Sequence, residues 1–117
     1  MSPKEPKLES QTLPRHFNEA LILSSLGRGA KHGYQLALDI EERSQGRFAF
    51  KHGTLYPILH KLEKEGLIEG DWSTEGQRGK RKQYQLTRDG RRYLKGLLAA
   101  WEDLMGDFFG LVGGKGR

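Results

Sequence analysis

Apolar side chains recur at three- and four-residue steps along the last part of this chain. This spacing places them on one face of an α-helix of about four turns. The residues are Tyr93, Leu94, Leu97, Leu98, Trp101, Leu104, Met105, Phe108 and Phe109. A chain of 117 residues fits one domain, and so small a domain cannot cover this much apolar surface on one helix. The pattern therefore predicts that the helix packs against a helix of a second chain.

The final helix and the two ends of the chain divide the sequence into four parts. The helix is expected over residues 87–110, with Thr87 as its N-terminal cap, and residues 111–117 are expected to form a flexible tail. Residues 1–13 carry two prolines, mixed charges and no periodic apolar face, which predicts a mobile arm. Residues 14–86 are left as the globular unit.

Three helices are expected in the first part of that unit. The first begins after Pro14, runs for about ten residues and is largely buried through Phe17, Ala20, Leu21, Leu23 and Leu26. The second begins at Gly33 and ends near residues 44–46. The third must start close to residues 52–54, because Pro57 lacks an N–H and fits only in or just past the first turn. Gly66 is expected to end it in a left-handed conformation.

Two strands follow, at residues 67–72 and 80–86, joined by a turn that closes a hairpin. Four basic residues lie at and just beyond this turn: Arg78, Lys80, Arg81 and Lys82. Helix, helix, helix, two-stranded wing and helix is the order of a winged helix-turn-helix. The sequence thus predicts a mainly α fold with a small β-hairpin, followed by a C-terminal dimerisation helix.

The composition limits the chemistry and the partners of the chain. Twenty Lys and Arg against fifteen Asp and Glu leave a formal charge of +5, which favours an anionic partner and nucleic acid first. The absence of cysteine excludes disulfides, thiolate catalysis and thiolate-bound zinc. No stretch is long and apolar enough for a membrane span or a signal segment, so we expect a soluble cytoplasmic protein with no membrane partner.

Three segments resemble the PadR family of bacterial transcriptional regulators. They are HGYQLALDIEERS at residues 32–44, GTLYPILHKLEKEGLIEGDW at 53–72 and GKRKQYQLTRDGRRYL at 79–94. The resemblance extends from Phe17 to Leu94, and the single helix after the wing is similar to the short subfamily, in which that helix carries the dimer contacts.

The resemblance implies a homodimeric repressor that binds double-stranded DNA and releases it when a small aromatic or lipophilic effector binds near the dimer helices. Two recognition helices about 34 Å apart would require a pseudo-palindromic operator. One departure from the family pattern precedes Gly53, where Lys51 and His52 replace the usual small capping residue. This leaves Thr54 or a water as the cap and puts a cation and an imidazole at the DNA groove.

The DNA contacts are expected at the second helix, the start of the third helix and the wing. They are Tyr34, Lys51, His52, Gly53, Thr54, Tyr56, Pro57, His60, Lys61, Arg78, Lys80 and Arg81. Both tyrosines have a plainer interpretation, in which they pack against the domain and expose only their hydroxyl groups.

The effector is expected near the middle of the last helix. Its predicted contacts are Trp101, Phe17, Leu21, Leu97, Met105 and Phe108. Trp101 would be a flat wall for an aromatic ligand, although a tryptophan in such a stripe also serves as a dimer core residue.

No cofactor, metal site or reaction is predicted. The four histidines do not pair at metal-ligand spacing, and no serine lies in a nucleophile motif. Three alternatives stay open: a winged-helix regulator without a small-molecule effector, controlled by abundance or by a protein partner; a winged helix that binds protein instead of DNA; and an enzyme.

Overall fold

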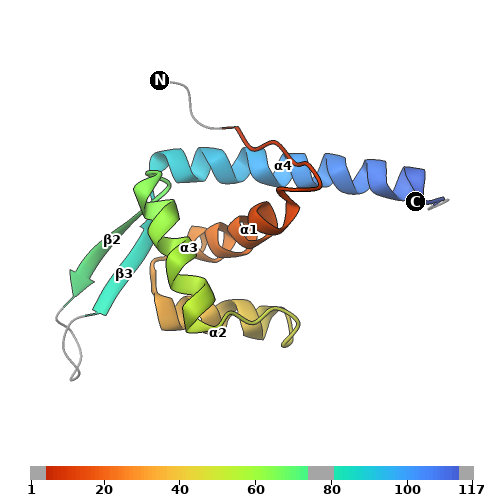
Figure 1. The fold of residues 1–117 in the computed structure, drawn as a ribbon. Coiled ribbons are helices and arrows are strands. Elements are labelled where there is room, and N and C mark those ends of the chain that lie inside the picture. The colour runs from red at the N-terminus through yellow and green to blue at the C-terminus, as the bar shows by residue number, and fades with distance from the viewer. Residues whose placement is uncertain (1–4, 74–80, 114–117) are drawn as a thin grey trace.

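The computed structural model describes residues 5–73 and 81–113. In these ranges the chain forms four helices and three strands (Figure 1). They are α1 (Leu13–Gly27), β1 (Lys31–His32), α2 (Gly33–Arg43), α3 (His52–Lys64), β2 (Ile68–Ser73), β3 (Arg81–Leu86) and α4 (Arg88–Leu111). The predicted fold class, a mainly helical winged helix-turn-helix with a C-terminal helix, is confirmed.

Helix α1 is longer and less apolar on its buried side than the sequence predicts. It spans 15 residues because it begins at Leu13, so that Pro14 lies in the first turn, where a missing N–H costs no helical hydrogen bond. Leu23 and Leu26 are buried as predicted, whereas Phe17 is 37% exposed. The buried side also includes Ile22 and three polar residues, His16, Glu19 and Ser25.

The wing consists of β2 and β3, and it belongs to a larger sheet than the predicted hairpin. Strand β3 pairs antiparallel with β2, placing Trp72 opposite Lys82, and also with β1, placing His32 opposite Gln83. The sheet order among the described strands is β1-β3-β2, so the prediction of a two-stranded wing was one strand short. Strand β1 has only two residues, which is too short for an alternating pattern to reveal.

The start of α4 is tied to the segment that links α3 to β2. Gly66 adopts the predicted left-handed conformation, with φ +80°, just after α3 ends. The Thr87 hydroxyl accepts a hydrogen bond from the Gly90 N–H at 2.9 Å, which confirms Thr87 as the cap of α4, and it donates to the Gly66 carbonyl at 2.7 Å. The predicted strand and helix boundaries here agree with the structure to within one or two residues.

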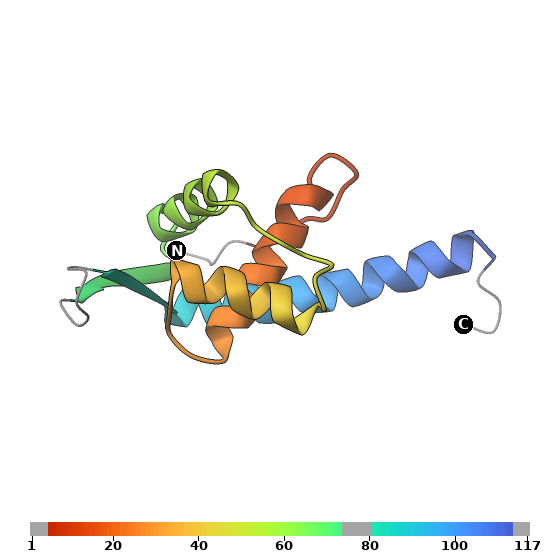
Figure 2. The same ribbon diagram turned by 90° about the horizontal axis from the view of Figure 1, so that it is seen from below.

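The C-terminal part of α4 projects beyond the rest of the chain (Figure 2). Leu97 is the last of its residues that is buried in the described part of the chain. Beyond it, Trp101 and Leu104 are half-buried, and the other large apolar side chains are exposed: Leu98, Met105, Phe108, Phe109 and Leu111.

Part of the segment 5–12, which precedes α1, contacts α4 and the hydrophobic core. Leu8 packs against the hydrophobic core, and the Pro6 ring lies 4.0 Å from the position of a Cβ on Gly96. The segment that the sequence predicts to be a mobile arm therefore contacts the core through Leu8.

Asp39 of α2 holds the first two helices together through three hydrogen bonds. Ser25 and Arg28 donate to one carboxylate oxygen at 2.5 and 2.8 Å, and Arg43 donates to the other at 3.2 Å. Burial alone would raise the pKa of Asp39, but these three donors and the positive charge of Arg28 outweigh it and lower the pKa to about 2.

This lowered pKa predicts an acid-sensitive contribution to stability. Because the folded pKa lies below the unfolded value, the contribution is complete above about pH 4 and is lost as the pH falls toward 2. We expect Asp39→Asn to lower the free energy of unfolding by about 2 kcal/mol at pH 7 and by little at pH 2, measured by urea denaturation. An equal loss at both pH values would contradict an ionic role for Asp39.

Candidate nucleic-acid interface

The N-terminus of α3 is exposed and carries no side-chain cap among the described residues. Lys51 is the N-cap residue with an extended backbone (ψ 153°), and its carbonyl accepts hydrogen bonds from the N–H groups of Thr54 and Leu55. Thr54 lies inside the helix, so the suggestion that its side chain caps α3 was wrong. Lys51, His52, Gly53 and Thr54 are all exposed, and the first backbone N–H groups of α3 face outward with them.

Tyr34 and Tyr56 lie on either side of this helix end. Tyr34, the second residue of α2, is 65% exposed, and Tyr56 is 38% exposed and stacks on the His52 ring with centroids 5.4 Å apart. The Tyr56 hydroxyl approaches Gly33 so closely that a Cβ at that position would overlap it. Gly33 therefore has to be glycine for Tyr56 to reach the start of α2.

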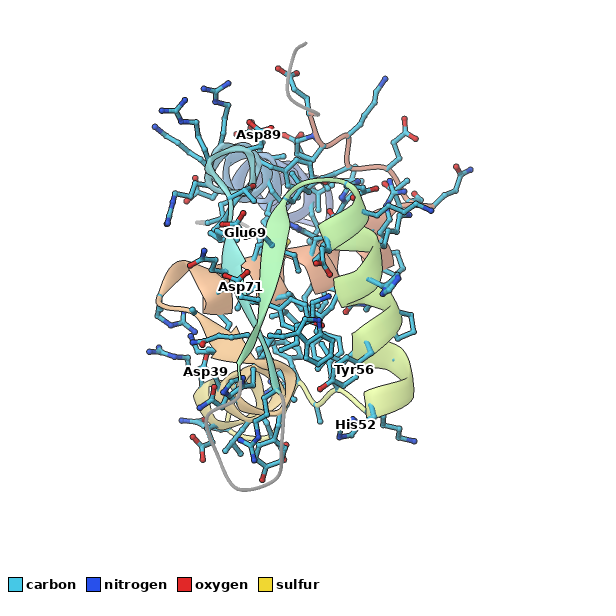
Figure 3. All side chains as sticks on the ribbon, turned by 90° about the vertical axis from the view of Figure 1, so that its left-hand side faces the viewer. Asp39, His52, Tyr56, Glu69, Asp71 and Asp89 are labelled. Carbon is cyan, nitrogen blue, oxygen red and sulfur yellow. The ribbon has the colours of Figure 1, made fainter. Side chains whose placement is uncertain are left out.

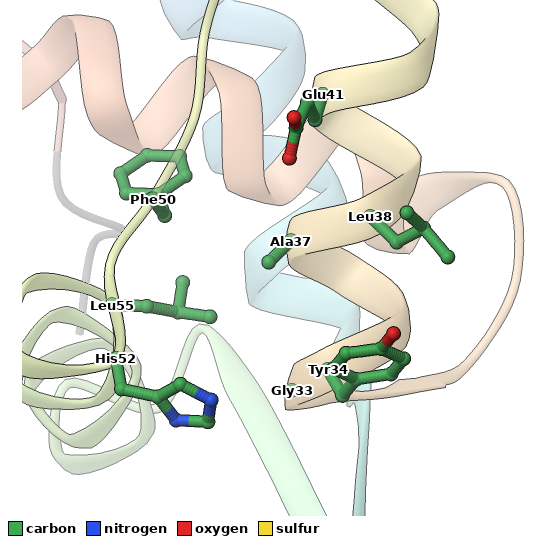
Figure 4. Close-up of a pocket in the computed structure, with 8 residues that line it drawn as sticks. All are labelled: Gly33, Tyr34, Ala37, Leu38, Glu41, Phe50, His52 and Leu55. Carbon is green, nitrogen blue, oxygen red and sulfur yellow. The ribbon is translucent and has the colours of Figure 1, made fainter. Parts of the chain in front are cut away.

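A depression of about 220 Å³ separates α2 from the start of α3 (Figure 4). Tyr34, Ala37 and Glu41 line it from α2, and Phe50, His52 and Leu55 line it from the link and α3. Tyr34 and His52 lie at its opening from opposite sides.

A second depression of about 480 Å³, the wing groove, lies between α3 and the wing. It is lined by His32, Gly33, Tyr34, Tyr56, His60, Trp72, Arg81, Lys82 and Tyr84. No carboxylate is among these lining residues. Figure 3 views the wing with Tyr56 beside it on α3 and with Glu69 and Asp71 on β2. The groove thus presents hydroxyl, imidazole, indole and cationic groups, which suit an anionic ligand.

The structure divides the predicted DNA contacts into four groups, and the first is the exposed start of α3 with Lys51, His52, Gly53 and Thr54. Tyr34, Tyr56, His60 and Arg81 come together at the wing groove. Pro57 and Lys61 line a different depression, with Arg15 of α1, on the side of α3 away from the wing. Arg78 and Lys80 lie outside the described residues.

Trp72 is a groove residue that sequence reasoning missed. It is 65% exposed and lines the groove beside Lys82, its partner across the strands. Alternation along β2 does not indicate this position, because it places Trp72 on the same face as Ile68, which is buried.

The predicted effector residues also separate in space. The Phe17 ring packs edge to face against Phe48 at 5.1 Å and against Trp101 at 6.0 Å between centroids. Leu21 lines a neighbouring depression of about 380 Å³ with Phe48 and Leu98. Leu97 is fully buried in the core of the single chain and offers no surface to a ligand, whereas Met105 and Phe108 are 39% and 50% exposed farther along α4.

Two further features of the described residues bear on the possible chemistry. They contain no group of three or more His, Asp or Glu side chains placed to hold a metal ion. Within the same ranges, none of the helices has the length and hydropathy needed to cross a membrane.

The chain is similar in sequence to known regulators. A sequence model described as the transcriptional regulator PadR-like family matches residues 22–96. An uncharacterised protein of Lysinibacillus sphaericus is 31% identical over 86 residues, which cover 74% of this chain and 79% of that protein. The negative transcriptional regulator PadR of Bacillus subtilis strain 168 is 33% identical over 73 residues, which cover 62% of this chain and 40% of that protein.

Solved structures agree with the sequence comparison. A PadR family transcription regulator from hypervirulent Clostridium difficile R20291 is similar with a TM-score of 0.71 and 30% identity, covering 83% of this chain and 99% of that chain. Bacillus subtilis PadR in complex with operator DNA is similar with a TM-score of 0.64 and 30% identity, covering 70% of this chain and 45% of that chain. The family model and the characterised matches are transcriptional regulators and not enzymes, as predicted for this chain.

Proposed function

The chain belongs to the PadR-like family of transcriptional regulators, and from this premise we propose that it is a homodimeric repressor that binds operator DNA and releases it when a small aromatic or lipophilic effector binds. In this proposal residues 14–86 bind DNA and residues 87–110 form the dimerisation helix. The PadR that was solved with operator DNA shares this fold over 70% of the present chain.

The observation that carries the proposal is that the exposed start of α3 and the wing groove lie on one side of the chain. Tyr56 takes part in both, since it stacks on His52 and lines the wing groove. A recognition helix that enters a major groove from its N-terminus brings the adjacent DNA backbone toward the wing. Tyr34, Tyr56 and Arg81 would then contact phosphates, while Thr54 and His52 would reach base edges.

The exposed apolar part of α4 supports a homodimer. Phe108 is 50% exposed and Leu111 is 86% exposed, and contiguous apolar patches of this kind mark interfaces. Packing α4 against the same helix of a second copy would bury them and set the distance between the two recognition helices. About 34 Å between those helices corresponds to half-sites one turn of DNA apart.

The effector is proposed to bind at the aromatic cluster of Phe17, Phe48 and Trp101. The Trp101 indole N–H is buried and has no hydrogen-bond acceptor among the described residues, and an unpaired buried donor is costly. A ligand acceptor or a group of the second protomer would satisfy it. A ligand that favours the DNA-free spacing of the two α4 helices weakens both half-sites, and a hundredfold loss requires about 2.7 kcal/mol of coupling.

Fluorescence anisotropy with a duplex selected from a random pool tests the proposal. We expect a palindromic selected site, with affinity that falls about a thousandfold between 50 and 200 mM salt. Planar aromatic compounds should release the DNA from the wild type, and Trp101→Ala should reduce that response while retaining salt-dependent binding in the absence of compound.

Each outcome discriminates between the alternatives. Binding that is weak, flat in salt and indifferent to sequence would indicate that the winged helix serves a protein partner. Specific binding that no compound relieves would favour a regulator controlled by abundance or by a protein. If Trp101→Ala responds with unchanged effector affinity, Trp101 serves only as a dimer core residue.

A further inference from the structure

In the sequence Lys82 belongs to the basic residues of the wing, but in the structure its side chain reaches α3. Its ammonium group lies 2.9 Å from a carboxylate oxygen of Glu63, near the end of α3. Both side chains are partly buried, at 22% and 29% exposure. The charge of Lys82 is therefore largely matched within the protein, unlike that of Arg81, for which no carboxylate partner lies among the described residues.

The path of the Lys82 side chain across the wing is built by its neighbours. A Cβ on Gly70 would lie 2.5 Å from the Lys82 Cε, so the lysine stem occupies the space that a larger residue at position 70 would fill. The ammonium group also lies 5.6 Å from the centroids of both the Trp72 and the Tyr84 rings. The hydrogen bond with Glu63 raises the pKa of Lys82, so the ammonium group is charged at neutral pH.

The covalent link between the wing and α3 is short and bends sharply. Helix α3 ends at Lys64 and β2 begins at Ile68, with Gly66 between them at φ +80°. From that bend α3 and the wing diverge (Figure 1). A small change of angle at the bend would become a large displacement at the far end of the wing.

We infer that the Lys82–Glu63 pair is a brace that fixes the angle between the wing and α3, so that Lys82 supports operator binding as a positioning residue and not as a phosphate contact. The inference rests on the proposed function, because it concerns how α3 and the wing are held in the relative position that DNA binding requires. Glu63 has the same role from the other side, which is unexpected for a carboxylate close to a DNA-binding surface.

Operator affinity over a salt series separates a brace from a phosphate contact. For a brace, Lys82→Met and Glu63→Gln should each weaken binding by roughly tenfold, since both protomers lose the pair, and the double variant should be no weaker than either. The salt dependence should stay that of the wild type. A phosphate contact predicts instead that Lys82→Met alone weakens binding and that the log–log salt slope falls by about 0.9 for each phosphate that is no longer neutralised.

Two matched variants complete the test. Arg81→Met removes the adjacent wing cation and should lower both the affinity and the salt slope, as a phosphate contact does. Exchanging the two charges, Glu63→Lys with Lys82→Glu, should recover part of the affinity that Lys82→Glu alone loses. No recovery, together with a lower slope in Lys82→Met, would overturn the brace.

Amide hydrogen exchange of the free protein tests the brace without DNA. Lys82→Met and Glu63→Gln should both increase exchange in β2 and β3 while the core of α1 remains protected. Unchanged exchange in both variants would overturn the inference. If the wild type shows no salt-dependent operator binding, the proposed function fails, and the exchange rates still decide whether the brace exists.

Discussion

Replacing Gly90 with alanine is expected to destabilise the folded chain by about 3 kcal/mol or more. The added Cβ would overlap the carbonyl oxygen of Leu67, with the Leu67 carbonyl carbon directly behind it. A flexible side chain could move aside, but this neighbour is backbone. It is also held in place, because the Leu67 carbonyl accepts a hydrogen bond from the Thr87 N–H at 3.1 Å.

Thermal unfolding followed by circular dichroism measures this effect. A loss of this size in a domain of about 100 residues lowers the Tm by more than about 10 °C. Gly96→Ala is the matched control on the same helix, because its Cβ meets nothing closer than 4.0 Å and alanine favours a helix by about 1 kcal/mol. If Gly90→Ala were as stable as the wild type, the close packing of α4 against the α3–β2 link would be wrong.

The second large effect is expected at the buried polar cluster of His16, Glu19 and Tyr93. One Glu19 carboxylate oxygen accepts a hydrogen bond from the Tyr93 hydroxyl at 2.7 Å and lies 2.7 Å from His16 Nδ1. His16 and Glu19 are 3% and 5% exposed. Burial and this carboxylate raise the pKa of Tyr93, which keeps its hydroxyl a donor. The cluster joins the start of α1 to α4.

We expect Glu19→Leu to lower the free energy of unfolding by about 3 kcal/mol, because two buried polar groups lose their partner at once. Glu19→Gln keeps an acceptor for Tyr93 and should lose about 1 kcal/mol, measured by urea denaturation. Adding Tyr93→Phe to Glu19→Leu should cost less than it costs the wild type, since the orphaned hydroxyl is removed. Strict additivity of the two changes would contradict a shared hydrogen bond.

Much of the architecture could be predicted because single residues such as proline, glycine and threonine mark where helices begin and end. Pro57 limits where α3 can begin, and the structure starts that helix at His52, within the predicted interval. Gly66 ends it as expected, and Thr87 caps α4. Strand β1 escaped prediction because a two-residue strand forms only when β3 is beside it.

The candidate interface was predicted less completely than the fold. Tyr34, Tyr56, His60 and Arg81 do share one groove, while Pro57 and Lys61 face α1. The α3 residues divide in this way because neighbours in a helix point about 100° from each other, and which side faces the wing depends on how α3 is packed. Trp72 joined the site only through its cross-strand position beside Lys82.

The family, the order of the helices and wing, and the excess apolar surface of α4 could be predicted from the sequence, because each follows from residues close together in the chain. The contacts of Lys82 with Glu63 and of Glu19 with Tyr93 could be found only in the folded chain. Those pairs are 19 and 74 residues apart. Their contacts depend on the angles at which elements pack, and local periodicity contains no information on those angles.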